Sequence, residues 1–252
     1  MKPRFAFVQS CALILLVSAA GHARPDEGER DRTQSQPPLT SRPDRAAFMR
    51  QHFAAVLVMH DAVIRGDLKT ARQQARTLAD RPSPQDLPAG ATPYLASMQS
   101  AAAGAATAVE LDDVANAAAS MLATCGDCHR AVGTMPAHAR PSSPVVGGAV
   151  GHMLAHKEAV DLMVQGLTVP SASLWQQGAE TLGDAPLRRA ALPRDPKLTK
   201  DVLASEEWVH QLADRARHAS DQRSRIYVYS ELIQSCGTCH ALRGNVWGPD
   251  KK

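Results

Sequence analysis

The chain has 252 residues and a formal net charge of +3, from 28 basic and 25 acidic residues. This near balance does not favour nucleic acid or an anionic membrane as a partner, because both attract a strong excess of positive charge. Only 4% of the residues are aromatic, alternating β-branched runs are absent and helical periodicity dominates, so the composition and pattern predict an all-α protein.

The first 23 residues have the organisation of a secretory signal peptide. Lys2 and Arg4 form a short positive segment, an apolar stretch runs from Phe5 to Ala20, and Gly21-His22-Ala23 offers small residues to a signal peptidase. The apolar stretch is shorter than the ~20 residues that a spanning helix needs, which disfavours an uncleaved anchor. We therefore expect a periplasmic protein with no stable membrane span after cleavage, which lowers the net charge from +3 to +1.

The remaining chain divides into a leader and two similar parts. Residues 24–41 are polar and contain proline, so they are predicted to be a disordered leader. Residues 42–135 and 148–252 are predicted to form two domains, joined by a proline-rich linker at 136–147.

The two parts correspond to each other, which indicates a tandem duplication. His52 to Gly66 aligns with His152 to Gly166, and the opening histidine and closing glycine match. We expect four helices in each half, over residues 44–65, 68–79, 93–108 and 111–132, and over residues 145–165, 172–182, 199–219 and 222–243. The helix ends are predicted from capping residues, with N-caps at Ser171 and Asp221 and C-terminal glycines at Gly66 and Gly166.

Each half ends in the five-residue motif C-x-x-C-H, at Cys125–His129 and at Cys236–His240. This is the attachment sequence of c-type haem: two thiols on one helical turn bond the porphyrin vinyl groups, and the histidine ligates the iron. We therefore predict two covalent haem c groups. The attachment residues are Cys125, Cys128, Cys236 and Cys239, and the proximal iron ligands are His129 and His240.

Two further interpretations of paired cysteines, a zinc site and a redox disulfide, explain less of the chain. Both leave the histidine after each pair, and the export signal, without a role. The fifth cysteine, Cys11, lies in the predicted signal peptide and is removed with it.

A haem motif on the last of four helices, with a basic Arg243 shortly after the second copy, resembles the class II c-type cytochromes, the cytochrome c-prime family. The resemblance covers most of the mature chain, taken as two units. It implies that each half is an antiparallel four-helix bundle with haem packed between helices near one end. The common small cytochrome c fold is not expected, because its motif opens the domain and only twelve residues follow His240 here. The chain departs from the family in its duplication and in its first-helix residues.

The sixth iron ligand is expected from the first two turns of the first helix of each half, because that helix runs antiparallel to the last one. His52 and His152 occupy the same place in the repeat, so we predict His/His ligation at both irons. Met49, Met153 and His156 are the competing ligands, and an open distal face is the remaining arrangement.

These residues predict a periplasmic dihaem carrier of single electrons rather than an enzyme, because no catalytic constellation beyond the irons is recognisable. Its partners would be periplasmic redox proteins, and a homodimer is possible. The competing interpretation is a gas-binding protein for nitric oxide or carbon monoxide with an open haem face. A dihaem peroxidase is a third, less favoured interpretation.

Overall fold

The computed structural model describes residues 41–84, 87–137, 147–184 and 196–242. The predicted signal peptide (1–23), the leader (24–41) except its last residue, and most of the linker (136–147) lie outside these residues. In the part of the chain that is described, no helix has both the length and the apolar character needed to cross a membrane.

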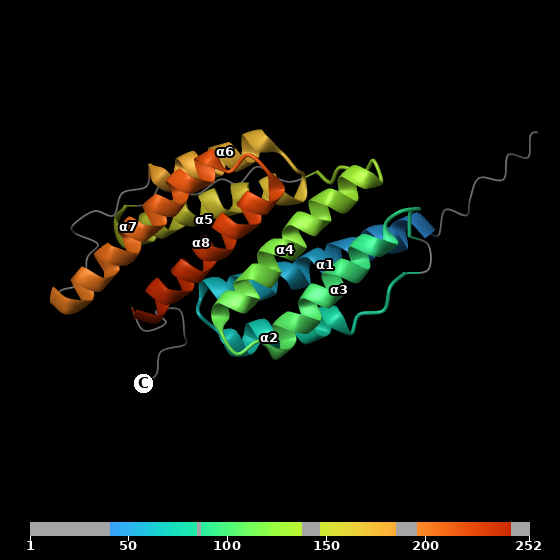
Figure 1. The fold of residues 1–252 in the computed structure, drawn as a ribbon, viewed down its shortest axis with the longest axis horizontal. Coiled ribbons are helices and arrows are strands. Elements are labelled where there is room, and N and C mark those ends of the chain that lie inside the picture. The colour runs from blue at the N-terminus through green and yellow to red at the C-terminus, as the bar shows by residue number, and fades with distance from the viewer. Residues whose placement is uncertain (1–40, 85–86, 138–146, 185–195, 243–252) are drawn as a thin grey trace, which may run out of the picture. The chain divides into compact units, whose positions relative to one another are not determined.

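The described residues form eight helices and no strand, which confirms the all-α prediction (Figure 1). Four helices precede the predicted linker and four follow it. They are α1 (Ser41–Ile64), α2 (Leu68–Ala79), α3 (Thr92–Thr107), α4 (Leu111–Ala131), α5 (Gly148–Thr168), α6 (Ala172–Gly183), α7 (Pro196–His218) and α8 (Gln222–Leu242).

Local capping residues set several helix ends. The Ser171 hydroxyl accepts a hydrogen bond from the N–H of Leu174 (3.3 Å) at the start of α6, and the Asp221 carboxylate accepts one from the N–H of Ser224 (2.8 Å) at the start of α8. Both predicted N-caps are therefore confirmed. Gly66 follows α1 with a φ of +71°, the left-handed conformation that a C-terminal glycine supplies.

The prediction that Gly166 ends its helix is wrong, because α5 continues to Thr168. A Cβ at position 166 would lie 2.7 Å from the backbone nitrogen of Trp175. The glycine therefore permits close approach of α6 and does not make a turn. The helix also begins at Gly148, three residues later than expected.

Consecutive helices of each half pack against one another, and the two halves also pack on each other through α4 and α8 (Figure 1). The Gln222 side chain at the start of α8 donates to the Ala123 carbonyl near the end of α4 (3.2 Å). At the other end, a Cβ at Gly237 would lie 2.8 Å from Leu111 at the start of α4. The two helices are therefore antiparallel, and their C-terminal turns lie at opposite ends of the contact.

The halves share further contacts, α8 with α1 and α4 with α5. Tyr229 on α8 is fully buried, and its hydroxyl lies 2.8 Å from His60 Nε2 on α1. Trp175 on α6 is also buried and donates its indole N–H to the Ala216 carbonyl on α7 (2.8 Å). The core thus continues from one half into the other.

Candidate functional site

The two C-x-x-C-H motifs lie in the last turns of α4 and α8, and no disulfide joins their four cysteines, all of which the structure describes. Burial, with the neighbouring Cys128 as a smaller cause, raises the pKa of Cys125 to about 12. Burial and the adjacent Cys239 raise the pKa of Cys236 to about 12 as well. A redox-active C-x-x-C pair needs a lowered thiol pKa, so this environment disfavours the redox-disulfide interpretation.

The two motifs are far apart along the antiparallel helices. Cys236 precedes Gly237, which packs at Leu111, whereas Cys125 lies 14 residues further along α4. A rise of ~1.5 Å per residue puts the motifs about 20 Å apart along that axis. The two cysteine pairs therefore cannot hold one ion together, which excludes a four-cysteine zinc site.

His129, the predicted proximal ligand in the first half, is oriented by the second half. Its Nδ1 lies 3.1 Å from the Thr168 backbone carbonyl at the end of α5 and donates its hydrogen there. Metal-binding histidines commonly donate one ring N–H to a carbonyl or carboxylate, which leaves the other nitrogen unprotonated for the metal. His129 therefore has Nε2 available as a ligand atom. His240 is half-buried at the equivalent place on α8.

His52 on α1 is a buried imidazole with unmet hydrogen-bonding capacity. The residue is 4% exposed, and neither ring nitrogen has a hydrogen-bond partner among the described residues. Burial, assisted by the positive charge of Arg81, lowers the pKa of His52 to about 4, so the ring is neutral at physiological pH. Leaving a buried polar group unsatisfied costs about 1–3 kcal/mol. A neutral, buried ring with a free lone pair fits a metal ligand.

His52 lies at the same level of the first half as the haem motif. The end of α1 meets the start of α4, because Gly66 and Leu111 both pack at Gly237. Counting back from Ile64, His52 is about 18 Å from that end, and Cys125 is about 21 Å from it, at 1.5 Å per residue. The two helices contact each other, so the fold brings this predicted distal residue alongside the predicted haem attachment site.

In the second half, His152 belongs to a cluster of three histidines around Glu206 of α7. His152 Nε2 is 3.1 Å from Oε2 and 3.0 Å from Oε1 of Glu206. His156 Nε2 and His210 Nε2 lie 3.7 and 3.3 Å from Oε1. One donor atom from each of His152, His156 and Glu206 lies within 4.8 Å of the others, a spacing that suits a metal ion.

The Glu206 carboxylate is ionised and close to the second haem motif. Burial raises its pKa, but the hydrogen bond from His152 and the charges of the surrounding imidazoles outweigh burial, and the net effect lowers the pKa. The charge of Glu206 in turn contributes to the raised pKa of Cys236. The carboxylate, the cluster and the haem motif therefore share one region of the second half.

The sequence does not by itself identify Glu206 and His210 as site residues. They are four residues apart on α7, so they lie on one helix face, and this i, i+4 pair was the available signal. His156 was expected as a ligand only if its helix began late, and α5 does begin later than expected. Met49 and Met153, which the sequence also offers as distal ligands, are half-buried on α1 and α5.

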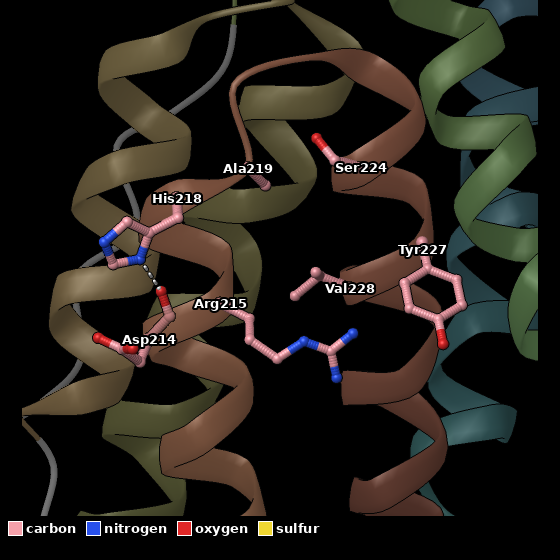
Figure 2. Close-up of a pocket in the computed structure, with 7 residues that line it drawn as sticks. All are labelled: Asp214, Arg215, His218, Ala219, Ser224, Tyr227 and Val228. Atoms are coloured by element: carbon pink, nitrogen blue, oxygen red, sulfur yellow. Dashed lines mark hydrogen bonds between the residues drawn. The ribbon is translucent and has the colours of Figure 1, made fainter.

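A surface hollow between the end of α7 and the start of α8 contains none of these residues. Figure 2 shows Arg215 and Tyr227 beside it, with the His218 ring donating to the Asp214 carbonyl (2.8 Å). Arg215 is already paired with Glu231 at 2.6 Å. The hollow lies at the end of α8 opposite to the haem motif.

The residues present fit a haem in each half: two thiols one turn apart, a histidine directly after them, and a buried histidine on the helix that opens the half. Comparison with protein-family models, with curated proteins and with solved structures finds no match for this chain.

Proposed function

We propose that the chain is an exported dihaem c-type cytochrome that carries single electrons between proteins of the periplasm. The observation that carries this proposal is the repeated C-x-x-C-H on the last helix of each half. The resemblance to class II c-type cytochromes supports it, because that family has its motif at the same place. In this proposal each half is a four-helix bundle, and the division into 42–135 and 148–252 stays a prediction.

Cys125 and Cys128 would attach the first haem, and Cys236 and Cys239 the second. A bound haem supplies a one-electron iron couple, and the protein supplies ligands, burial and nearby charges. His129 would hold the first iron from the proximal side, with its ring fixed by the Thr168 carbonyl.

His52 and His152 would close the distal faces. Both are buried, on the first helix of their half, at matching positions of the repeat. A protein ligand on each side of the iron favours electron transfer, because the coordination is then the same in both oxidation states. An open face would instead favour the gas-binding protein.

The first test is the mass and visible spectrum of the purified holoprotein. We expect two covalent haem groups, sharp low-spin bands on reduction and little carbon monoxide binding. A mass equal to the bare polypeptide would overturn the haem assignment. High-spin bands with rapid carbon monoxide binding would replace the electron carrier with the gas-binding protein.

His52→Ala and His152→Ala then test the distal ligands one at a time. Each variant should convert one of the two haems to a form that binds carbon monoxide. His218→Ala is the matched control, because this exposed histidine on α7 bonds only to its own helix in the described structure. The periplasmic redox partners and a homodimer are part of the prediction and are not needed for this test.

A further inference from the structure

The cluster around Glu206 has no counterpart in the first half, although the two halves align. By the repeat spacing of the first helices, His156 corresponds to Val56. The third and fourth helices of the halves are offset by a constant 111 residues, because α3 ends at Thr107 and α7 at His218. With this offset, Glu206 and His210 correspond to Leu95 and Gln99. A carboxylate therefore lies beside the predicted distal histidine in one half only.

The side chains of His152 and Glu206 make the arrangement that supports a metal ligand. One nitrogen of His152, Nε2, is held by the carboxylate, and the other, Nδ1, is buried and has no hydrogen-bond partner in the described part of the chain. Carboxylates bonded to the second nitrogen of a ligating histidine fix the ring and make it a stronger electron donor. His156 and His210 surround the same carboxylate and favour its ionised form.

The first half has the opposite charge near its distal histidine. Phe48 stacks on His52 with ring centroids 5.6 Å apart, and the Arg81 guanidinium lies 5.8 Å from the Phe48 centroid. Neither nitrogen of His52 is bonded to a carboxylate of the described residues. A cation near an iron centre favours the reduced state, whereas an anion favours the oxidised state.

We propose that Glu206 is a positioning residue that fixes His152 as the distal ligand of the second haem, and that its charge gives this haem the lower reduction potential of the two. The inference rests on the proposed function, and it adds a direction to it. The second half is the donating end and the first half the accepting end of the pair.

A redox titration of the holoprotein, followed by visible absorbance, tests this assignment. We expect two one-electron midpoints in the wild-type protein. Glu206→Gln removes the charge and keeps the shape, so the lower midpoint should shift upward while the higher one stays in place. Glu206→Asp restores the carboxylate and should return the lower midpoint towards the wild-type value.

The matched control is Glu207→Gln, which removes the same charge from an exposed neighbour on α7 that bonds only to Gln211 in the described structure. It should move neither midpoint. The inference is overturned if Glu206→Gln moves nothing, if it moves the higher midpoint, or if Glu206→Asp behaves like Glu206→Gln.

Two further measurements separate this inference from the proposed function. Haem content reports the function: a protein without covalent haem overturns both, whereas two haems with an unchanged Glu206→Gln titration overturn only the inference. Metal analysis reports the rival occupant. Stoichiometric zinc or copper that is lost in Glu206→Gln would mean that His152, His156 and Glu206 bind that ion instead, and would overturn the inference.

Discussion

Tyr229 is the residue that joins the two halves by a buried side-chain hydrogen bond. Burial raises the pKa of this phenol well above its usual value of 10, so the hydroxyl stays protonated and donates to His60 Nε2 at 2.8 Å. The other His60 nitrogen then donates to Asp61 (3.2 Å). Tyr229→Phe would leave the buried His60 nitrogen unsatisfied, and we expect a loss of about 1–3 kcal/mol in the free energy of unfolding.

Urea denaturation followed by circular dichroism measures this loss. Tyr227→Phe is the control, because Tyr227 is 57% exposed and two residues away on the same helix. Equal stability of the two variants would show that the His60 contact contributes nothing net.

Single residues of the candidate site were predictable to different degrees. The motif residues are recognisable by their fixed spacing alone, and His52 and His152 by their place in the repeat. Glu206 was not predictable, because the first half has Leu95 at that position and repetition gives no signal. A largely buried carboxylate becomes a candidate only when the fold brings α7 against α5.

At the scale of helices, short-range signals were sufficient for most boundaries. The structure gives α2 the predicted bounds, because Asp67 caps it and Gly66 separates it from α1. The end of α5 was predicted wrongly because the same residue type serves two purposes. Gly66 supplies a left-handed turn, whereas Gly166 supplies space for Trp175, and only the tertiary contact distinguishes them.

The glycine inside each haem motif makes a contact between elements of different halves. A Cβ at Gly126 would collide with the Leu167 carbonyl of α5, and one at Gly237 would lie 2.6 Å from the Val63 carbonyl of α1. The haem motif itself accepts any residue here, so we expect Gly126→Ala to attach haem normally. The helices would have to separate, at a cost of about 1–3 kcal/mol for overpacking.

Thermal unfolding of the holoprotein checks this, with Gly104→Ala as the control. A Cβ at Gly104 on α3 meets nothing within 4 Å. Alanine there should raise stability by up to about 1 kcal/mol, through helix propensity alone. A Gly126→Ala variant as stable as wild type would contradict the close contact of α4 with α5.

At the scale of the whole molecule, the number and order of helices followed from periodicity, but the association of the halves did not. The contact of α4 with α8 depends on which apolar face each helix presents, and a repeat has the same faces twice. The halves meet with opposite polarity: the end of α4 lies on the end of α5, and the end of α8 on the end of α1. Duplicated units that contact each other through corresponding surfaces resemble a twofold dimer within one chain.

This association predicts that the two halves unfold together. The carbonyl that orients His129 belongs to α5, and Tyr229 of α8 bonds to α1, so neither half keeps all its buried contacts without the other. Calorimetry of the holoprotein should therefore show one transition whose calorimetric and van't Hoff enthalpies agree, as in a cooperative single unit. Tyr229→Phe should lower the temperature of that one transition. Two separate transitions, of which Tyr229→Phe moves only one, would instead mean that the halves are independent domains.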